Sequence, residues 1–153
     1  MPGIPMDIPG PKKKVLVIED DPDVARMLVT LLGRLDVELL TAPDGLVGVA
    51  LAASEKPHLI LMDINMPRMN GLDAIRTIRG YTELANVPII VLTAFANPEN
   101  IREAVDVGAD DFLIKANLLA GEGIDRVRQA LETRPTKRRA LLRSESPFGK
   151  RST

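Results

Sequence analysis

The chain has 153 residues, enough for one domain with a hydrophobic core, and its 45% hydrophobic and 27% charged content is ordinary for a globular protein. The absence of cysteine excludes disulfide bonds, thiolate catalysis and zinc–thiolate sites. No apolar stretch approaches the ~18 residues that span a bilayer. Residues 1–14 lack the pattern of a secretory signal, so we expect a cytoplasmic location and no membrane span.

The net charge of −1 hides an uneven distribution along the chain. Residues 1–14 carry +2 and residues 134–153 carry +6, which leaves −9 for the segment between them. This pattern predicts a disordered N-terminal extension over 1–13, an acidic folded domain over 14–133 and a basic, disordered tail over 134–153. We interpret the tail as a solvated extension, with binding to an anionic partner as the alternative.

Strand and helix signals alternate through the folded segment. Strands are predicted at 15–19, 37–41, 58–62, 88–92 and 111–115. The first, third and fourth are continuous apolar runs, which is typical of parallel strands covered on both faces. The second is more polar and suits the edge of a sheet.

Helices are predicted between the strands from their caps and their apolar spacing. They begin after Asp21-Pro22, near Asp44, near Asn70, at Asn97-Pro98 and near Gly123. Five strand–helix pairs predict an α/β fold, a doubly wound five-stranded parallel sheet with five helices.

Polar residues follow four of the apolar strands. Glu19 and Asp20 follow the first strand and Asp63 the third, while Thr93 and Lys115 end the fourth and the fifth. Because the carboxyl ends of parallel strands share one edge of the sheet, we expect these side chains to converge. Carboxylates select Mg²⁺, and an ammonium and a hydroxyl can contact phosphoryl oxygens, so the pattern predicts a site for both.

Four motifs in fixed order carry a family resemblance. They are Val-Leu-Val-Ile-Glu-Asp-Asp-Pro (15–22), Leu-Met-Asp-Ile-Asn-Met-Pro-Arg-Met-Asn-Gly (61–71), Val-Leu-Thr-Ala (91–94) and Gly-Ala-Asp-Asp-Phe-Leu-Ile-Lys (108–115). Over residues 14–133 the chain resembles the receiver domain of two-component response regulators, and in particular the stand-alone, chemotaxis-type receivers. The resemblance implies a flavodoxin-like sheet with strand order 2-1-3-4-5.

The resemblance also implies roles for the residues at the sheet edge. Asp63 is expected to accept a phosphoryl group, and a Mg²⁺ ion is expected to be held by Glu19, Asp20, Asp63 and the backbone carbonyl of Asn65. Lys115 is expected to bind oxygens of the transferred group.

Two residues correspond to the family's switch. Thr93 is expected to bind a phosphoryl oxygen and to move with it, and Phe112 is expected to turn inward as Thr93 moves. A core strand residue is the alternative for Phe112. Asn65 and Phe95 stand where receivers tune phosphate lifetime, and Phe95 has no group to orient a water, so slow to intermediate decay is expected.

The partners are likewise implied by the resemblance. The phosphoryl donor would be a sensor histidine kinase or a histidine phosphotransfer protein, because His58, the one histidine, is interpreted as structural. A downstream protein would bind the face formed by the fourth helix, the fifth strand and the last helix, and a homodimer is possible. We expect a single-domain regulator without a DNA-binding domain, and no turnover enzyme.

Ala116 departs from the family pattern, in which a proline in a cis peptide follows the lysine. A cis bond before alanine would cost roughly 2.5–4 kcal/mol, so we expect a trans bond after Lys115. Residues 116–122 contain two glycines and are predicted to form a mobile loop.

Two other functions remain open from the sequence. A phosphatase of the haloacid dehalogenase type also uses a strand-end Asp and Mg²⁺, but it normally needs a second Asp where this chain has Asn65. A phosphorylation-independent, receiver-like interaction module is the main alternative, although the presence of Asp63, Lys115 and the acid pair argues against it.

Overall fold

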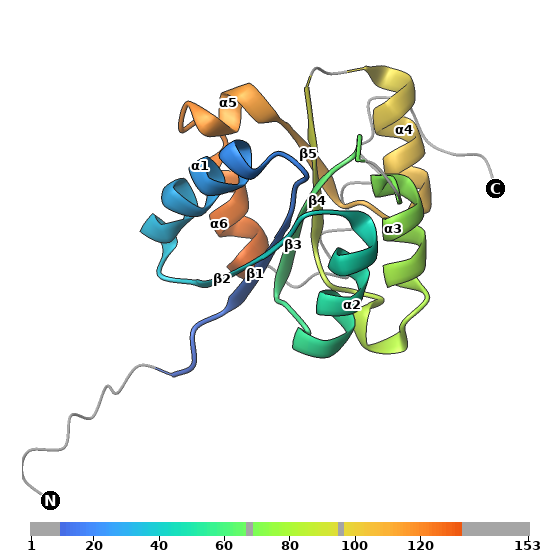
Figure 1. Cartoon of the computed structure of the whole chain (residues 1–153), viewed down its shortest axis with the longest axis horizontal. Helices are drawn as coiled ribbons and strands as arrows, with labels where there is room; N and C mark the ends of the chain where they lie inside the picture. The colour runs from blue at the N-terminus through green and yellow to red at the C-terminus, as the bar shows by residue number, and fades with distance from the viewer. Residues whose placement is uncertain (1–9, 67–68, 95–96, 133–153) are drawn as a thin grey trace, which may run out of the picture.

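Five short strands form the central sheet in the computed structural model, which describes residues 10–66, 69–94 and 97–132 (Figure 1). They are β1 (Lys14–Ile18), β2 (Glu38–Ala42), β3 (Leu59–Asp63), β4 (Ile89–Thr93) and β5 (Asp111–Ile114). All neighbours are parallel and the order is β2-β1-β3-β4-β5. The doubly wound, flavodoxin-like fold with this strand order is therefore confirmed.

Helices cover both faces of the sheet. They are α1 (Pro22–Leu32), α2 (Gly45–Glu55), α3 (Gly71–Arg79), α4 (Pro98–Val107), α5 (Lys115–Leu119) and α6 (Ile124–Glu132), with the 3₁₀ helices η1 (Gly33–Leu35) and η2 (Thr82–Leu84). One layer holds α2, α3 and α4, and the other holds α1, α5 and α6 (Figure 1). Two apolar cores follow, one on each face.

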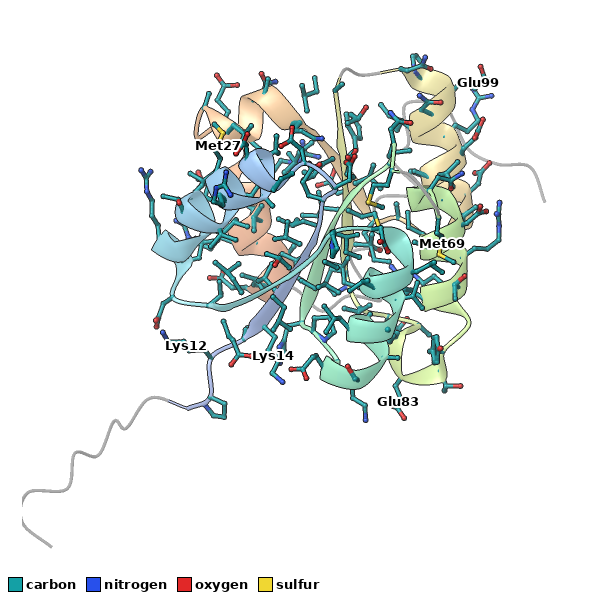
Figure 2. All side chains as sticks on the ribbon, viewed as in Figure 1. Lys12, Lys14, Met27, Met69, Glu83 and Glu99 are labelled. Atoms are coloured by element: carbon teal, nitrogen blue, oxygen red, sulfur yellow. The ribbon has the colours of Figure 1, made fainter. Side chains whose placement is uncertain are left out.

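Burial along the strands explains their composition. Every residue of β3 and β4 is buried, as is β1 from Val15 onward, because helices cover both of their faces. In β2, at the edge, only Ala42 is buried. Figure 2 shows side chains filling both interlayer spaces, while Lys12, Glu83 and Glu99 lie at the periphery.

Side-chain caps fix where four helices begin, as the sequence predicts. The capping side chains belong to Asp21, Asp44, Asn70 and Asn97. Each accepts a hydrogen bond from a backbone N–H of the first turn, which would otherwise lack an intrahelical partner.

One prediction about the end of the sheet is wrong. Residues 116–122 were expected to form a mobile loop in a five-helix domain, but Lys115–Leu119 forms a sixth helix, α5. Leu118 is fully buried among apolar side chains of α1, α6 and the sheet, and this burial stabilises a segment too short to be helical alone. The peptide bond between Lys115 and Ala116 is trans, as expected.

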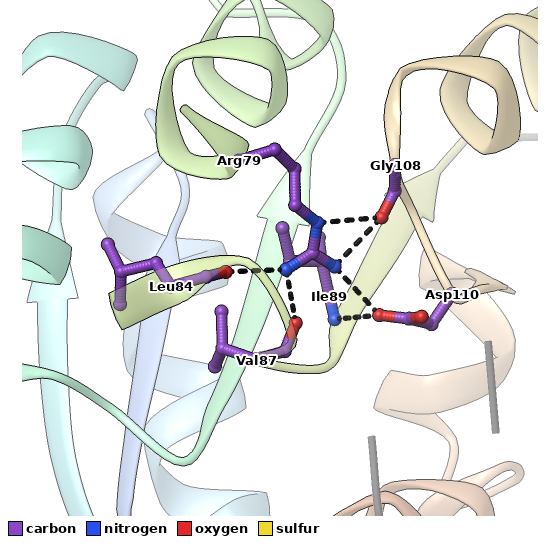
Figure 3. Close-up of polar contacts among 6 residues, drawn as sticks. All are labelled: Arg79, Leu84, Val87, Ile89, Gly108 and Asp110. Carbon is purple, nitrogen blue, oxygen red and sulfur yellow. Dashed lines mark hydrogen bonds and ion pairs between the residues drawn. The ribbon is translucent and has the colours of Figure 1, made fainter. Parts of the chain in front are cut away.

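A buried ion pair ties together elements at the amino end of the sheet (Figure 3). Arg79, at the end of α3, contacts Asp110 at 2.9 Å between Nη2 and Oδ2. The guanidinium also donates to the carbonyls of Leu84, Val87 and Gly108. Asp110 Oδ2 accepts a further hydrogen bond from the backbone N–H of Ile89. The pair thus joins α3, η2, β4 and the turn that follows α4.

Several sequence predictions concern residues outside the described ranges. The tail over 134–153, most of the extension over 1–13, and Phe95 belong to this group. Among the described residues, no helix has the length and apolar composition needed to cross a membrane.

Candidate functional site

The strand register gathers the site residues at the carboxyl edge of the sheet. Asp63 ends β3 and pairs with Leu92, so Thr93 at the end of β4 lies one step further along the edge. Thr93 in turn pairs with Ile114, and Lys115 follows it as the first residue of α5. Glu19 and Asp20 follow β1, the other neighbour of β3.

The turn after Asp63 depends on a glycine. The N–H of Gly71 donates to the carbonyl of Ile64 at 2.8 Å, which closes the turn against the end of β3. A Cβ at position 71 would lie 2.7 Å from the carbonyl oxygen of Asp63. Residue 71 must therefore be glycine if the turn is to approach the site this closely.

Three carboxylates and one ammonium meet in the site. One oxygen each of Glu19, Asp20 and Asp63 lie within 4.8 Å of one another. Lys115 Nζ lies 2.8 Å from Glu19 Oε1 and 3.3 Å from Asp63 Oδ2. Glu19 and Asp63 are buried, whereas Asp20 is exposed. The predicted convergence of these four residues is therefore present.

The environment of Asp63 disfavours its charged form. Burial and then the neighbouring charge of Glu19 raise the pKa of Asp63 from 3.8 to about 7, against the opposing effect of Lys115. Burial alone would lower the pKa of Lys115, but Glu19 and Asp63 raise it on balance. The ammonium therefore stays charged beside Glu19 and Asp63.

The donor set fits a hard divalent cation. All the converging ligands are carboxylate oxygens, which Mg²⁺ prefers. Glu19 Oε1 is buried and accepts no directed hydrogen bond from the described residues, although the Lys115 ammonium lies beside it. A second cation between the acids would relieve the repulsion that raises the pKa of Asp63.

The remaining predicted residues surround this cluster. Asn65 is exposed, and its backbone N–H donates to Asp63 Oδ1 at 3.2 Å. Thr93 is buried at the end of β4. Phe112 is half-buried on β5 and packs against the core on the α2–α4 side. The outward-lying His58 accepts a hydrogen bond from the N–H of Lys14, in line with its structural interpretation.

Arg126 of α6 is a residue near Phe112 that sequence reasoning missed. Its guanidinium lies 5.9 Å from the centre of the Phe112 ring and forms an ion pair with Asp111. Position 126 lies on the polar side of a helix, where arginine is unremarkable, so the sequence holds no signal for this contact.

The family model for the response regulator receiver domain matches residues 15–127. The chain belongs to the receiver-domain family of response regulators. Its relatives include the transcriptional regulatory protein PrrA of Mycobacterium tuberculosis, 34% identical over 129 residues, 84% of this chain and 54% of PrrA. A probable transcriptional regulator, ycf27 of Galdieria sulphuraria, is 35% identical over 68% of this chain and 40% of its own length. This receiver domain thus spans about half the length of these curated relatives.

Solved structures agree with this assignment. The receiver domain of the Pseudomonas aeruginosa sensor histidine kinase PA1611, solved with a magnesium ion in its active-site cleft, is 28% identical with a TM-score of 0.72. The match covers 80% of this chain and 99% of that one. The chemotaxis protein CheY4 of Vibrio cholerae is 30% identical with a TM-score of 0.69, over 76% of this chain and 98% of CheY4.

Proposed function

We propose that this receiver accepts a phosphoryl group on Asp63 from a phosphohistidine of a sensor kinase or phosphotransfer protein. The observation that carries the proposal is the position of the Asp63 carboxylate. It lies 3.3 Å from the Lys115 ammonium, and one of its oxygens is within 4.8 Å of an oxygen of both Glu19 and Asp20.

The chemistry follows from groups within the chain. A carboxylate oxygen of Asp63 attacks phosphorus, a P–O bond forms, and the P–N bond of the donor breaks with its electron pair returning to the imidazole. Lys115 is placed to contact an oxygen of the arriving group, and the hydroxyl of Thr93 is the second candidate donor. Water later cleaves the P–O bond, which restores the carboxylate and releases inorganic phosphate.

A Mg²⁺ ion fits the oxygens of Glu19, Asp20 and Asp63, with the backbone carbonyl of Asn65 as the fourth proposed ligand. When bound, it would neutralise charge on the transferred group. The domain changes its own state and returns to it, so the proposed role is a signalling switch and not a turnover enzyme.

The output surface is proposed to be the face of α4, β5 and α6, where a downstream protein or a second copy of the chain would bind. Phe112 and its contact with Arg126 lie on this face. A change at Thr93 would reach it through β5, which is paired with β4 along its length. Sedimentation velocity with and without a phosphodonor would show whether the protein itself dimerises.

The test is incubation with acetyl phosphate and Mg²⁺ followed by intact-mass measurement. The protein is expected to gain one phosphoryl group, and Asp63→Asn none. Asp21→Asn is the matched control, because the side chain of Asp21 caps α1 and asparagine caps a helix equally well. Absence of uptake by the unmodified protein would support a phosphorylation-independent module, and uptake by Asp63→Asn would place the acceptor elsewhere.

A further inference from the structure

The lysine of the site is held by a helix instead of an extended loop. Lys115 is the first residue of α5, and the strand residue before it, Ile114, has the extended backbone of an N-cap position. The end of α5 is closed by three backbone hydrogen bonds, in which the carbonyls of Ala116, Asn117 and Leu118 accept from residues 120–122. The backbone direction at Lys115 is therefore set by α5.

Two leucine side chains pack α5 against the rest of the domain, and Leu118 is the more deeply buried of the two. Leu118 is fully buried in the core formed by α1, α6 and one face of the sheet. Its neighbours on α5, Ala116 and Asn117, are exposed, so they add little packing. Leu119 is half-buried and lines a shallow groove together with Leu31 and Met27 of α1. Met27 is labelled in Figure 2.

The same short helix thus joins the core to the site. Lys115 and Leu118 are three residues apart, a spacing that places both on one side of a helix. The side chain of Lys115 is 21% exposed and forms ion pairs with Glu19 and Asp63. Any shift of α5 would move the ammonium relative to the acceptor carboxylate.

We infer that Leu118 is a positioning residue, which holds α5 in place and thereby sets the distance of Lys115 from Asp63. The inference rests on the proposed function for its chemical meaning.

The first test compares three variants. Leu118→Ala removes the anchor, and Ala116→Gly weakens helix α5 without removing any core atom, because Ala116 is exposed. Leu32→Ala, in the same core but at the far end of α1, is the control for lost stability. Because misplacement by about 1 Å can cost up to about 100-fold in rate, we expect phosphorylation by acetyl phosphate to slow about tenfold or more in the first two.

The second measurement separates positioning from general damage. Lys115 is expected to react faster with an amine-methylating reagent in Leu118→Ala and Ala116→Gly, measured by mass spectrometry relative to the exposed Lys56. Mg²⁺ affinity, measured by calorimetry, should not fall in either variant, because Glu19, Asp20 and Asp63 stay in place. Leu118→Met conserves volume, so both the rate and the labelling should return to those of the unmodified protein. If Leu118→Ala does not fold, the Ala116→Gly variant decides the question.

The outcomes distinguish this inference from the proposed function. Unchanged Lys115 labelling in both variants, an equal change in Leu32→Ala, or a Mg²⁺ affinity that falls together with the rate would overturn the positioning role. If the unmodified protein takes up no phosphoryl group, the proposed function fails, while the labelling comparison still decides whether α5 places Lys115.

Discussion

Charged side chains gather at both ends of the sheet, but positive and negative groups are matched at only one end. At the amino end, Arg79 faces Asp110, and each guanidinium nitrogen donates at least one hydrogen bond (Figure 3). At the carboxyl end, three carboxylates converge, and two of them, those of Glu19 and Asp63, contact the ammonium of Lys115. Among the described residues, the acids thus outnumber the cation that contacts them at the carboxyl end.

This contrast shows how one fold can separate stability from function. A matched pair such as Arg79–Asp110 offers nothing to a ligand, because its partners are already within the protein. An excess of acids raises the free energy of the folded protein, and a bound cation would relieve the repulsion between them. Removing a charge at the amino end should therefore lower the free energy of unfolding, whereas removing an acid at the carboxyl end should raise it.

Arg79→Ala is expected to have the largest effect. It leaves Asp110 buried without its cation and removes a donor from the carbonyls of Leu84, Val87 and Gly108. We expect the free energy of unfolding to fall by about 3–5 kcal/mol, measured by urea denaturation.

The control for this loss is Arg76→Ala, one turn earlier on α3. Arg76 forms an ion pair with Asp73 in which both side chains are more than half exposed, so the expected loss is below about 1 kcal/mol. Equal losses in the two variants would contradict the structural importance of the buried pair.

The contrast between the two ends was only half visible in the sequence. Glu19, Asp20, Asp63 and Lys115 each end an apolar run, and parallel strands bring such ends together, so their convergence could be predicted. Arg79 and Asp110 are 31 residues apart and neither ends a strand run, so nothing local predicts their pairing.

Helices could be predicted where a capping residue and a repeated apolar spacing mark them, and not where a helix is too short to show either. The helices after Asp21, Asp44, Asn70 and Asn97 have a capping side chain and several turns of apolar spacing. The five residues of α5 are too few to show a period, and the glycines behind them favour a loop. This helix is stabilised by the burial of Leu118 in the core, which the local sequence does not reveal.

Asp63→Asn should stabilise the protein when Mg²⁺ is absent. The raised pKa of Asp63, about 7 against 3.8, means that its contribution to stability is present below pH 3.8 and is lost as the pH rises through 7. Asparagine avoids that loss. At pH 8 in EDTA we expect a gain of about 1–2 kcal/mol in the free energy of unfolding, and no gain near pH 4.

Added Mg²⁺ provides the check on this explanation. At pH 8 it should stabilise the unmodified protein more than Asp63→Asn, because the variant has lost a charged ligand. A gain for Asp63→Asn that does not change between pH 4 and pH 8 would show that charge at position 63 is not its cause.

Lys115→Met tests the smallest of these effects, the competition between the lysine and a metal ion. The Lys115 ammonium lies 2.8 Å from Oε1 of Glu19, a residue proposed to bind Mg²⁺. Methionine keeps the unbranched stem but removes the charge, so we expect Mg²⁺ to bind about three- to tenfold more tightly, as measured by calorimetry. Lys14→Met is the matched control, since Lys14 pairs with Glu55 and starts β1 at the opposite end of the sheet. If Mg²⁺ binding weakens in Lys115→Met, the lysine assists the metal site instead of competing with it, and the excess of acid at this end of the sheet is smaller than the geometry indicates.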